Sequence, residues 1–306
     1  MTDDSLLDAI VIGGSFAGLS AALQLARARR SVRILDAGRP RNRFADAAHG
    51  FFSRDGEDPR TLVAAAQAQL RRYPSARVIA AEAVRAAAID GGFEVAAADG
   101  SVLAARKLVL AFGVNDVLPQ LPGAAERWGK SVLHCPYCHG YEFSGRRLGV
   151  LQSASFSAQK ALLVADWGPT TLYLNGEPAP DAQVAAQLAQ RGVAIEPAPI
   201  AELLGAEQSL SALRLGDGRE VAIDALFIAG RTRLNSALAE QLGCVIEEGL
   251  MGPVIRTDDS RQTTVAGVYA AGDIARPMHN ATWAASDGVT AGASAHQALV
   301  FQPLAA

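Results

Sequence analysis

The feature that most constrains this chain lies near its start, where a glycine-rich turn joins an apolar segment to an alanine-rich one. Residues 8–12 are typical of a buried strand, the segment up to about Arg30 of a helix, and residues 32–35 of a second strand. A strand, a helix and a strand in this order form a βαβ unit, which requires a parallel sheet. The chain therefore opens as an α/β protein.

The turn of this unit reads Gly-Gly-Ser-Phe-Ala-Gly from Gly13 to Gly18. In the pattern G-x-G-x-x-G, the first glycine serves the tight turn and the last allows close helix packing, while N–H groups at the helix start hold a pyrophosphate. Ser15 replaces the middle glycine and is small enough to keep the backbone accessible. Asp36 follows Gly18 by 18 residues, near the roughly 20 expected for a carboxylate that takes ribose hydroxyls. Nucleotide binding is favoured over a plain turn with a solvated Asp36.

Composition and charge exclude several classes of protein. The chain has 306 residues, of which 50% are hydrophobic and 19% charged, so it can bury a sizeable core in about two domains. The net charge is -3 and the basic residues form no cluster, so we expect no nucleic-acid partner. The N-terminus is acidic where a signal peptide is basic, and its apolar run is too short to span a bilayer. We expect a cytoplasmic protein without a membrane partner.

A second unit of the same kind begins at Arg147. It is predicted to contain a strand, a helix, a strand and a helix, at residues 148–151, 155–167, 170–174 and 181–191. Between the two units, residues 78–110 alternate short apolar runs with Gly-Gly and Asp-Gly turns, which predicts an antiparallel β-meander. Near the end of the chain, a strand at 267–271 precedes a helix from about Trp283 to Leu299.

Cys135 and Cys138 are two of only three cysteines and form a C-x-x-C motif. Such a pair can close a small disulfide, and a helix N-terminus or a nearby protonated histidine makes the thiolate available near neutral pH. His139 follows directly and can carry the proton. The third cysteine, Cys244, stands alone and is expected in the core.

Three other interpretations of the motif are open. C-x-x-C-H is also the c-type haem attachment motif, but that chemistry needs export, and we expect no signal peptide from the acidic N-terminus. A zinc site would need a second pair of ligands, which the distant Cys244 does not supply, so we expect no metal. Two inert core cysteines are also conceivable. The flanking His134 and His139 favour redox chemistry.

The chain resembles the low-molecular-weight thioredoxin reductase family over essentially its full length. The residues that carry this resemblance are Gly13–Gly18 with Asp36, the strand end Ala111-Phe112-Gly113, Cys135–Cys138, and Tyr269-Ala270-Ala271-Gly272-Asp273. The resemblance implies an α/β fold with two Rossmann-like, three-layer nucleotide-binding domains. The FAD-binding domain would be discontinuous, at residues 1–114 and 231–306, and residues 115–230 would form an inserted domain that carries the CxxC. A homodimer with noncovalently bound FAD is also implied.

The resemblance also implies roles for individual residues. Cys138 would face the flavin, Cys135 would exchange with the substrate, and His139, which replaces an aspartate of the reductases, would act as acid or base. Asp273 would bond to the ribityl chain of FAD, and the turn at 280–282 would lie near the isoalloxazine. The full set of expected FAD-binding residues is Gly13, Gly14, Ser15, Ala17, Gly18, Asp36, Asn42, His49, Ala111, Gly113, Gly272, Asp273, Ala281 and Thr282.

The chain departs from the reductase pattern at its second nucleotide site. After the strand at 148–151 the reductases have a glycine-rich turn, whereas this chain has Gln152, Ala154 and Ser157 at the three small-residue positions. The glutamine would crowd a turn meant for pyrophosphate. No Lys or Arg lies between Lys160 and Arg191, so the 2′-phosphate of NADPH would lack its cationic partners. We therefore expect poor use of NADPH.

The chain combines Gly-Gly-Ser with Phe-Ala-Gly, the segment Cys-Pro-Tyr-Cys-His-Gly-Tyr-Glu and a degraded pyridine-nucleotide site. This combination resembles the FAD-dependent dithiol oxidase branch, whose members close disulfides in gliotoxin-like and holomycin-like metabolites and pass electrons to oxygen. The leading hypothesis is thus a thiol oxidase acting on a small-molecule dithiol or a thioredoxin-like protein. One alternative is a disulfide reductase fed by NAD(P)H, ferredoxin or flavodoxin. Another is a non-enzymatic FAD-binding redox sensor.

Overall fold

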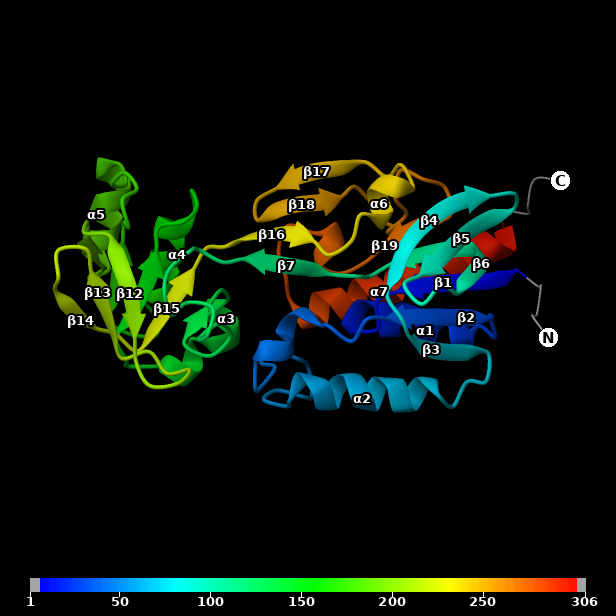
Figure 1. The fold of residues 1–306 in the computed structure, drawn as a ribbon, viewed down its shortest axis with the longest axis horizontal. Coiled ribbons are helices and arrows are strands. Elements are labelled where there is room, and N and C mark those ends of the chain that lie inside the picture. Colours follow the sequence, from blue (N-terminus) through cyan, green and yellow to red (C-terminus); the bar gives the residue numbers. More distant parts are fainter. Residues whose placement is uncertain (1–5, 302–306) are drawn as a thin grey trace. The chain divides into compact units, whose positions relative to one another are not determined.

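The computed structural model describes residues 6–301, which divide into two compact units (Figure 1). The first unit contains the described residues of the segments 1–43, 58–115 and 232–306, and the second contains residues 44–57 and 116–231. The sequence analysis assigned residues 44–57 to the FAD-binding domain, whereas the structure groups them with the second unit because they pack against its residues.

The first unit is built on a mixed sheet of seven strands in the order β3-β2-β1-β6-β5-β4, with β19 also paired to β6. Its strands are β1 Leu7–Ile12, β2 Val32–Asp36, β3 Ala76–Ala80, β4 Ala83–Ile89, β5 Gly92–Ala97, β6 Val102–Leu110 and β19 Val268–Ala270. The antiparallel meander comprises β4, β5 and β6 only. The expectation that it begins at residue 78 was wrong, because β3 pairs in parallel with β2.

Four parallel strands of this sheet end at one edge. Ile12 pairs with Leu35 on one side and with Leu110 on the other, and Leu110 pairs with Ala270. The turns that follow β1, β2, β6 and β19 therefore meet at the carboxyl edge, where open α/β sheets bind their ligands.

Helices cover the sheet of the first unit: α1 Phe16–Arg27, α2 Pro59–Leu70, α6 Leu238–Gln241 and α7 Ala281–Phe301, with the 3₁₀ turns η1 Arg41–Phe44 and η3 Asp273–Ala275. Helix α7 lies directly on α1 (Figure 1), and small residues allow this close approach. A Cβ on Gly288 would lie 2.0 Å from the carbonyl oxygen of Ala17. A hairpin of β17 Ile246–Gly249 and β18 Gly252–Ile255 completes the unit.

The second unit contains a five-stranded parallel sheet in the order β11-β10-β9-β15-β8. Its strands are β8 Val132–Leu133, β9 Leu148–Leu151, β10 Thr170–Tyr173, β11 Ala194–Glu196 and β15 Ala225–Ile228, and a separate antiparallel sheet holds β12 Ile200–Leu204, β13 Ala212–Leu215 and β14 Glu220–Ala222. The helices are α3 Pro136–His139, α4 Ser157–Val164 and α5 Ala182–Gln190, with the 3₁₀ turn η2 Tyr141–Phe143. The strands β7 Val114–Val117 and β16 Arg231–Leu234 pair with each other where the chain passes between the units.

Both units thus have the Rossmann-like α/β architecture that the sequence predicts. The expected helix at 155–167 is shorter in the structure and spans Ser157–Val164. Among residues 6–301, no helix is both long and apolar enough to cross a membrane.

Candidate active site

The glycine turn after β1 leaves room only for backbone. Gly13 has φ of +112°, and a Cβ there would lie 2.1 Å from the carbonyl oxygen of Ala111. A Cβ on Gly18 would lie 1.8 Å from the carbonyl oxygen of Gly13. Ser15, by contrast, is the N-cap of α1 with φ of −106°, and its side chain does not cap the helix. Serine therefore causes no strain at the position where the usual pattern has glycine.

Asp36 lies against this turn. A Cβ on Gly14 would come within 2.5 Å of Oδ2 of Asp36, and the other carboxylate oxygen accepts a hydrogen bond from the N–H of Gly38 at 3.0 Å. A backbone cradle at a helix N-terminus beside a carboxylate fits the pyrophosphate and ribose of a dinucleotide. The residues of the first unit thus fit the cofactor that the sequence predicts.

Asp273 adds a third group to the same edge. Gly272, which precedes it, has φ of +81°, and a Cβ there would lie 3.0 Å from the Cβ of Ala17 in the first turn of α1. Nη1 of Arg41 donates to Oδ2 of Asp273 at 2.9 Å and lies 2.7 Å from Nδ1 of His279. Sequence reasoning missed Arg41 and His279 because neither belongs to a motif.

The other expected FAD-binding residues of the first unit lie in turns that follow strands, in η1 or at the start of α7. Gly113 has φ of +71°, and its neighbour Phe112 accepts a hydrogen bond at its carbonyl from Nδ2 of Asn235 at 3.0 Å. Asn280 caps α7, because its side chain accepts from the N–H of Thr282 at 2.8 Å. Ala111 follows β6, Asn42 lies in η1 and Ala281 begins α7.

His49 is the one expected FAD-binding residue that lies in the second unit. Its Nε2 is 3.3 Å from Oε1 of Glu142, and its Nδ1 is 3.6 Å from Oδ1 of Asp55. Glu142 belongs to η2, three residues after His139. The structure therefore brings His49 to the segment that follows the Cys pair.

Cys135 and Cys138 form a disulfide at the start of α3, with their Cα atoms 5.3 Å apart. Cys135 is the N-cap of this helix, and its sulfur accepts the backbone N–H of Cys138 at 3.1 Å. A proline follows at the first helical position, where the missing N–H has no cost. When the disulfide opens, the same N–H can stabilise a thiolate at Cys135.

The surroundings hold the Cys helix in place. Tyr137 packs edge-on against the Trp167 ring at 5.9 Å between centroids, and a Cβ on Gly140 would lie 2.6 Å from that ring. Nζ of Lys160 donates to the carbonyl oxygens of His134 at 2.6 Å and Ile228 at 2.9 Å. The segment before the pair is thus tied to α4 and to the end of β15.

Burial lowers the pKa of His139 below the ordinary value. Attraction to the Glu142 carboxylate raises this pKa and repulsion from His49 lowers it, but both effects are smaller than that of burial. His139 is therefore mostly neutral near pH 7 and able to accept a proton.

The turn after β9 is closed by its own serine. Oγ of Ser157, which is fully buried, accepts the backbone N–H groups of Ser153 and Ala154, each at 3.1 Å. Nε2 of Gln152 reaches the carbonyl oxygen of Ala154 at 3.4 Å, while its Oε1 is buried without a hydrogen-bond partner in the described chain. Backbone N–H groups that would hold a pyrophosphate in a nucleotide-binding turn are bonded within the protein.

The segment after β10 offers no cation either. Oδ1 of Asn175 accepts the N–H of Ile200 at 2.9 Å, and Asp181 caps α5 by accepting the N–H of Val184 at 2.8 Å. Glu177 is the charged residue between them. Carboxylates at this position would repel a 2′-phosphate.

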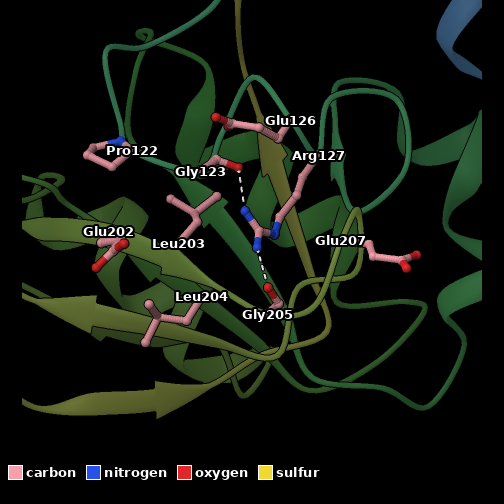
Figure 2. Close-up of a pocket in the computed structure, with 9 residues that line it drawn as sticks. All are labelled: Pro122, Gly123, Glu126, Arg127, Glu202, Leu203, Leu204, Gly205 and Glu207. Atoms are coloured by element: carbon pink, nitrogen blue, oxygen red, sulfur yellow. Dashed lines mark hydrogen bonds between the residues drawn. The ribbon is translucent and has the colours of Figure 1, made fainter.

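The second unit also has a pocket of about 480 Å³ between the segment before β8 and the β12–β13 hairpin (Figure 2). Arg127, which is only 7% exposed, donates to the carbonyl oxygens of Gly123 at 3.0 Å and Gly205 at 2.6 Å. The guanidinium joins two backbone segments, and this contact stabilises the unit. Glu126, Glu202 and Glu207 lie around the pocket.

Comparison with known proteins places these features in context. The profile of the pyridine nucleotide-disulphide oxidoreductase family matches residues 7–288. Thioredoxin reductase tcpT from Claviceps purpurea is 36% identical, over 98% of this chain and 96% of the relative. The crystal structure of an oxidoreductase from Agrobacterium tumefaciens is 43% identical, with a TM-score of 0.94 over 98% of this chain and all of that chain. The chain in the crystal structure of HlmI is 36% identical, with a TM-score of 0.91, and the match covers 98% of this chain and 94% of that chain.

Proposed function

Because the chain belongs to the pyridine nucleotide-disulphide oxidoreductase family and is similar to thioredoxin reductases in it, we propose that it is an FAD-dependent dithiol oxidase. The first unit binds FAD, and the second carries the redox-active pair Cys135 and Cys138. Electrons enter from the substrate dithiol, not from a pyridine nucleotide.

The observation that supports this proposal best is a contrast within the second unit. The Cys pair is accessible, whereas the turn after β9 has its amides bonded internally. The disulfide of Cys135 and Cys138 is partly exposed, whereas the amides after β9 are bonded to Ser157. A pyrophosphate would have to displace that buried hydroxyl, and it would gain no cation in return. A reductase fed by NAD(P)H would need this site, but an oxidase does not.

The exchange steps follow from disulfide chemistry. A substrate thiol releases its proton to solvent, its thiolate attacks the sulfur of Cys135, the bond to Cys138 breaks, and Cys138 leaves as a thiolate. His139 accepts the proton of the second substrate thiol, whose sulfur then attacks the substrate sulfur of the mixed disulfide. Cys135 leaves as a thiolate that the N–H of Cys138 stabilises. The substrate loses two electrons and two protons and becomes a disulfide.

FAD would supply the two-electron acceptor that returns the pair to its disulfide, with oxygen as the terminal acceptor. The backbone at Gly13–Gly18 would hold its pyrophosphate, and Asp36 its adenosine ribose. Asp273 would bond to the ribityl chain.

Two exposed aromatic rings support a small apolar dithiol as the substrate. Tyr137, between the two cysteines, is 71% exposed, and Tyr141, at the start of η2, is 81% exposed. Such rings, beside the disulfide, can make apolar contact with a bound dithiol. The test compares the turnover of small dithiols with that of reduced thioredoxin, and faster oxidation of thioredoxin would contradict this part of the proposal.

We also propose that the protein is a homodimer, which light scattering checks.

One experiment tests the whole proposal. The purified flavoprotein is mixed anaerobically with NADPH, NADH or dithiothreitol, and reduction is followed by the flavin absorbance. We expect rapid, stoichiometric bleaching by dithiothreitol and slow, incomplete bleaching by both nucleotides. Rapid bleaching by micromolar NADPH would show a reductase, and a colourless protein that FAD cannot reconstitute would end the proposal.

A further inference from the structure

Arg41, Asp273 and His279 form a cluster that the proposed exchange chemistry does not use. Nη1 of Arg41 contacts Asp273 at 2.9 Å and His279 at 2.7 Å, and the side chains of Arg41 and Asp273 are only 13% and 17% exposed. The three residues come from η1, from η3 and from the segment before α7. Ordering a long side chain between separate segments has an entropic cost, so its position requires an explanation.

The cluster lies at the carboxyl edge of the first unit, beside the start of α1. Asp273 directly follows Gly272, whose Cβ position is 3.0 Å from the Cβ of Ala17. Ala17 is in the first helical turn, where the N–H groups for a pyrophosphate lie. Arg41 belongs to the loop that follows β2, which ends in Asp36 at this same edge.

The charges at this edge of the sheet call for a cation when FAD is bound. The pyrophosphate of FAD carries two negative charges, and the cradle already contains the carboxylates of Asp36 and Asp273. A guanidinium is the side chain best suited to phosphate oxygens, because it is always charged and presents a planar fork of donors. Its contacts with Asp273 and His279 orient such a fork before the ligand arrives.

We propose that Arg41 binds the pyrophosphate of FAD and that Asp273 and His279 position it. This inference rests on FAD as the cofactor of the proposed function. The competing explanation is that Arg41 only neutralises and orients Asp273, which would itself contact the cofactor.

The test measures FAD affinity of the apoprotein by flavin fluorescence, without any turnover. Arg41→Gln should weaken binding about 10- to 100-fold, the usual effect of losing hydrogen bonds to a charged group. Arg41→Lys keeps the charge and should lose less. The matched control is Arg43→Gln, because Arg43 is exposed in the same 3₁₀ turn and donates to the carbonyl oxygen of Pro40. Its affinity should equal that of the wild type.

A double-mutant cycle separates the two explanations. In an Asp273→Asn background, Arg41→Gln should still weaken FAD binding about tenfold or more if the guanidinium contacts the pyrophosphate itself. No further loss in that background, or no loss in the single variant, would overturn the inference. If Arg41→Gln does not fold, Arg41→Lys in both backgrounds gives the same comparison. A wild-type apoprotein that binds no FAD would refute the proposed function instead.

Discussion

Two turns at corresponding positions of the two units differ in what occupies them. In the first unit, the last position of the turn is Gly18, which lies against the carbonyl oxygen of Gly13, so that no side chain fits. Its counterpart Ser157 places a hydroxyl in the turn and accepts two backbone N–H groups. The first turn keeps its amides for a ligand, whereas the second satisfies its own.

The difference shows how the same fold can carry a turn whose amides are not available to a nucleotide. A strand, a turn and a helix follow each other in both units, and the strands adjacent to β9 remain parallel. The two turns differ only in what bonds to their amides. An internal hydroxyl satisfies buried amides as well as an external phosphate does, so the fold of the unit is kept. A Rossmann-like unit can therefore persist as the carrier of a Cys pair.

The largest effect is expected for the Cys pair. If the second turn binds no nucleotide, the pair must receive its electrons from a substrate dithiol. Cys135→Ser and Cys138→Ser should each abolish dithiol turnover. In Cys135→Ser, the remaining Cys138 thiolate should give a long-wavelength charge-transfer band with oxidised FAD, and its loss at acid pH reports the thiolate pKa. Cys138→Ser should lack the band and trap substrate as a mixed disulfide. A band in Cys138→Ser instead would reverse the assigned roles.

The next effect concerns the proton that the second unit must remove. His139→Ala should slow dithiol turnover by roughly 10² to 10⁴, the usual contribution of general base catalysis, with FAD still bound. Burial lowers the pKa of His139, so the base stays neutral to lower pH, and the acid limb of the wild-type kcat/KM profile should lie below the ordinary histidine value of about 6.5. Unchanged turnover in His139→Ala would remove the histidine from the mechanism.

A swap of the key residue tests the comparison of the turns itself. Gly18→Ser imitates the second unit and should weaken FAD binding by about 100-fold or more, roughly 3 kcal/mol, because the new Cβ would lie 1.8 Å from the Gly13 carbonyl oxygen. The matched change Ser157→Gly should leave the ratio of flavin to protein unchanged. Equal flavin loss in both variants would mean that the two turns do not differ in this way.

The smallest effect is expected for the reverse conversion. The triple variant Gln152→Gly, Ala154→Gly and Ser157→Gly should improve flavin reduction by NADH by no more than about 30-fold, since the two N–H groups freed from Ser157 each recover a hydrogen bond worth about 1 kcal/mol. NADPH should gain less, because no cation for its 2′-phosphate is introduced. Fast reduction of the variant by NADPH would show that the turn alone excludes the nucleotide.

Much of the architecture could be predicted from the apolar periodicity and the glycine-containing turns of the sequence. The βαβ opening, the second unit from Arg147 and the helix near the C-terminus were predicted and are present. Errors occurred where local pattern and pairing diverge: β3 resembles a meander strand in sequence, yet it pairs in parallel with β2. Strand direction depends on a partner that lies far along the chain, which an apolar pattern does not specify.

By itself, the sequence determined the residue types at each turn, the Cys pair and the absence of glycine and cations at the second nucleotide site. Only the tertiary structure decided what these residues contact. The hydroxyl of Ser157 on two amides, the Arg41 contacts with Asp273 and His279, and the position of His49 beside Glu142 each depend on distances of a few ångströms. Except for the turn at Ser157, these contacts join residues far apart in the chain, and only the packing of the folded elements brings such residues together.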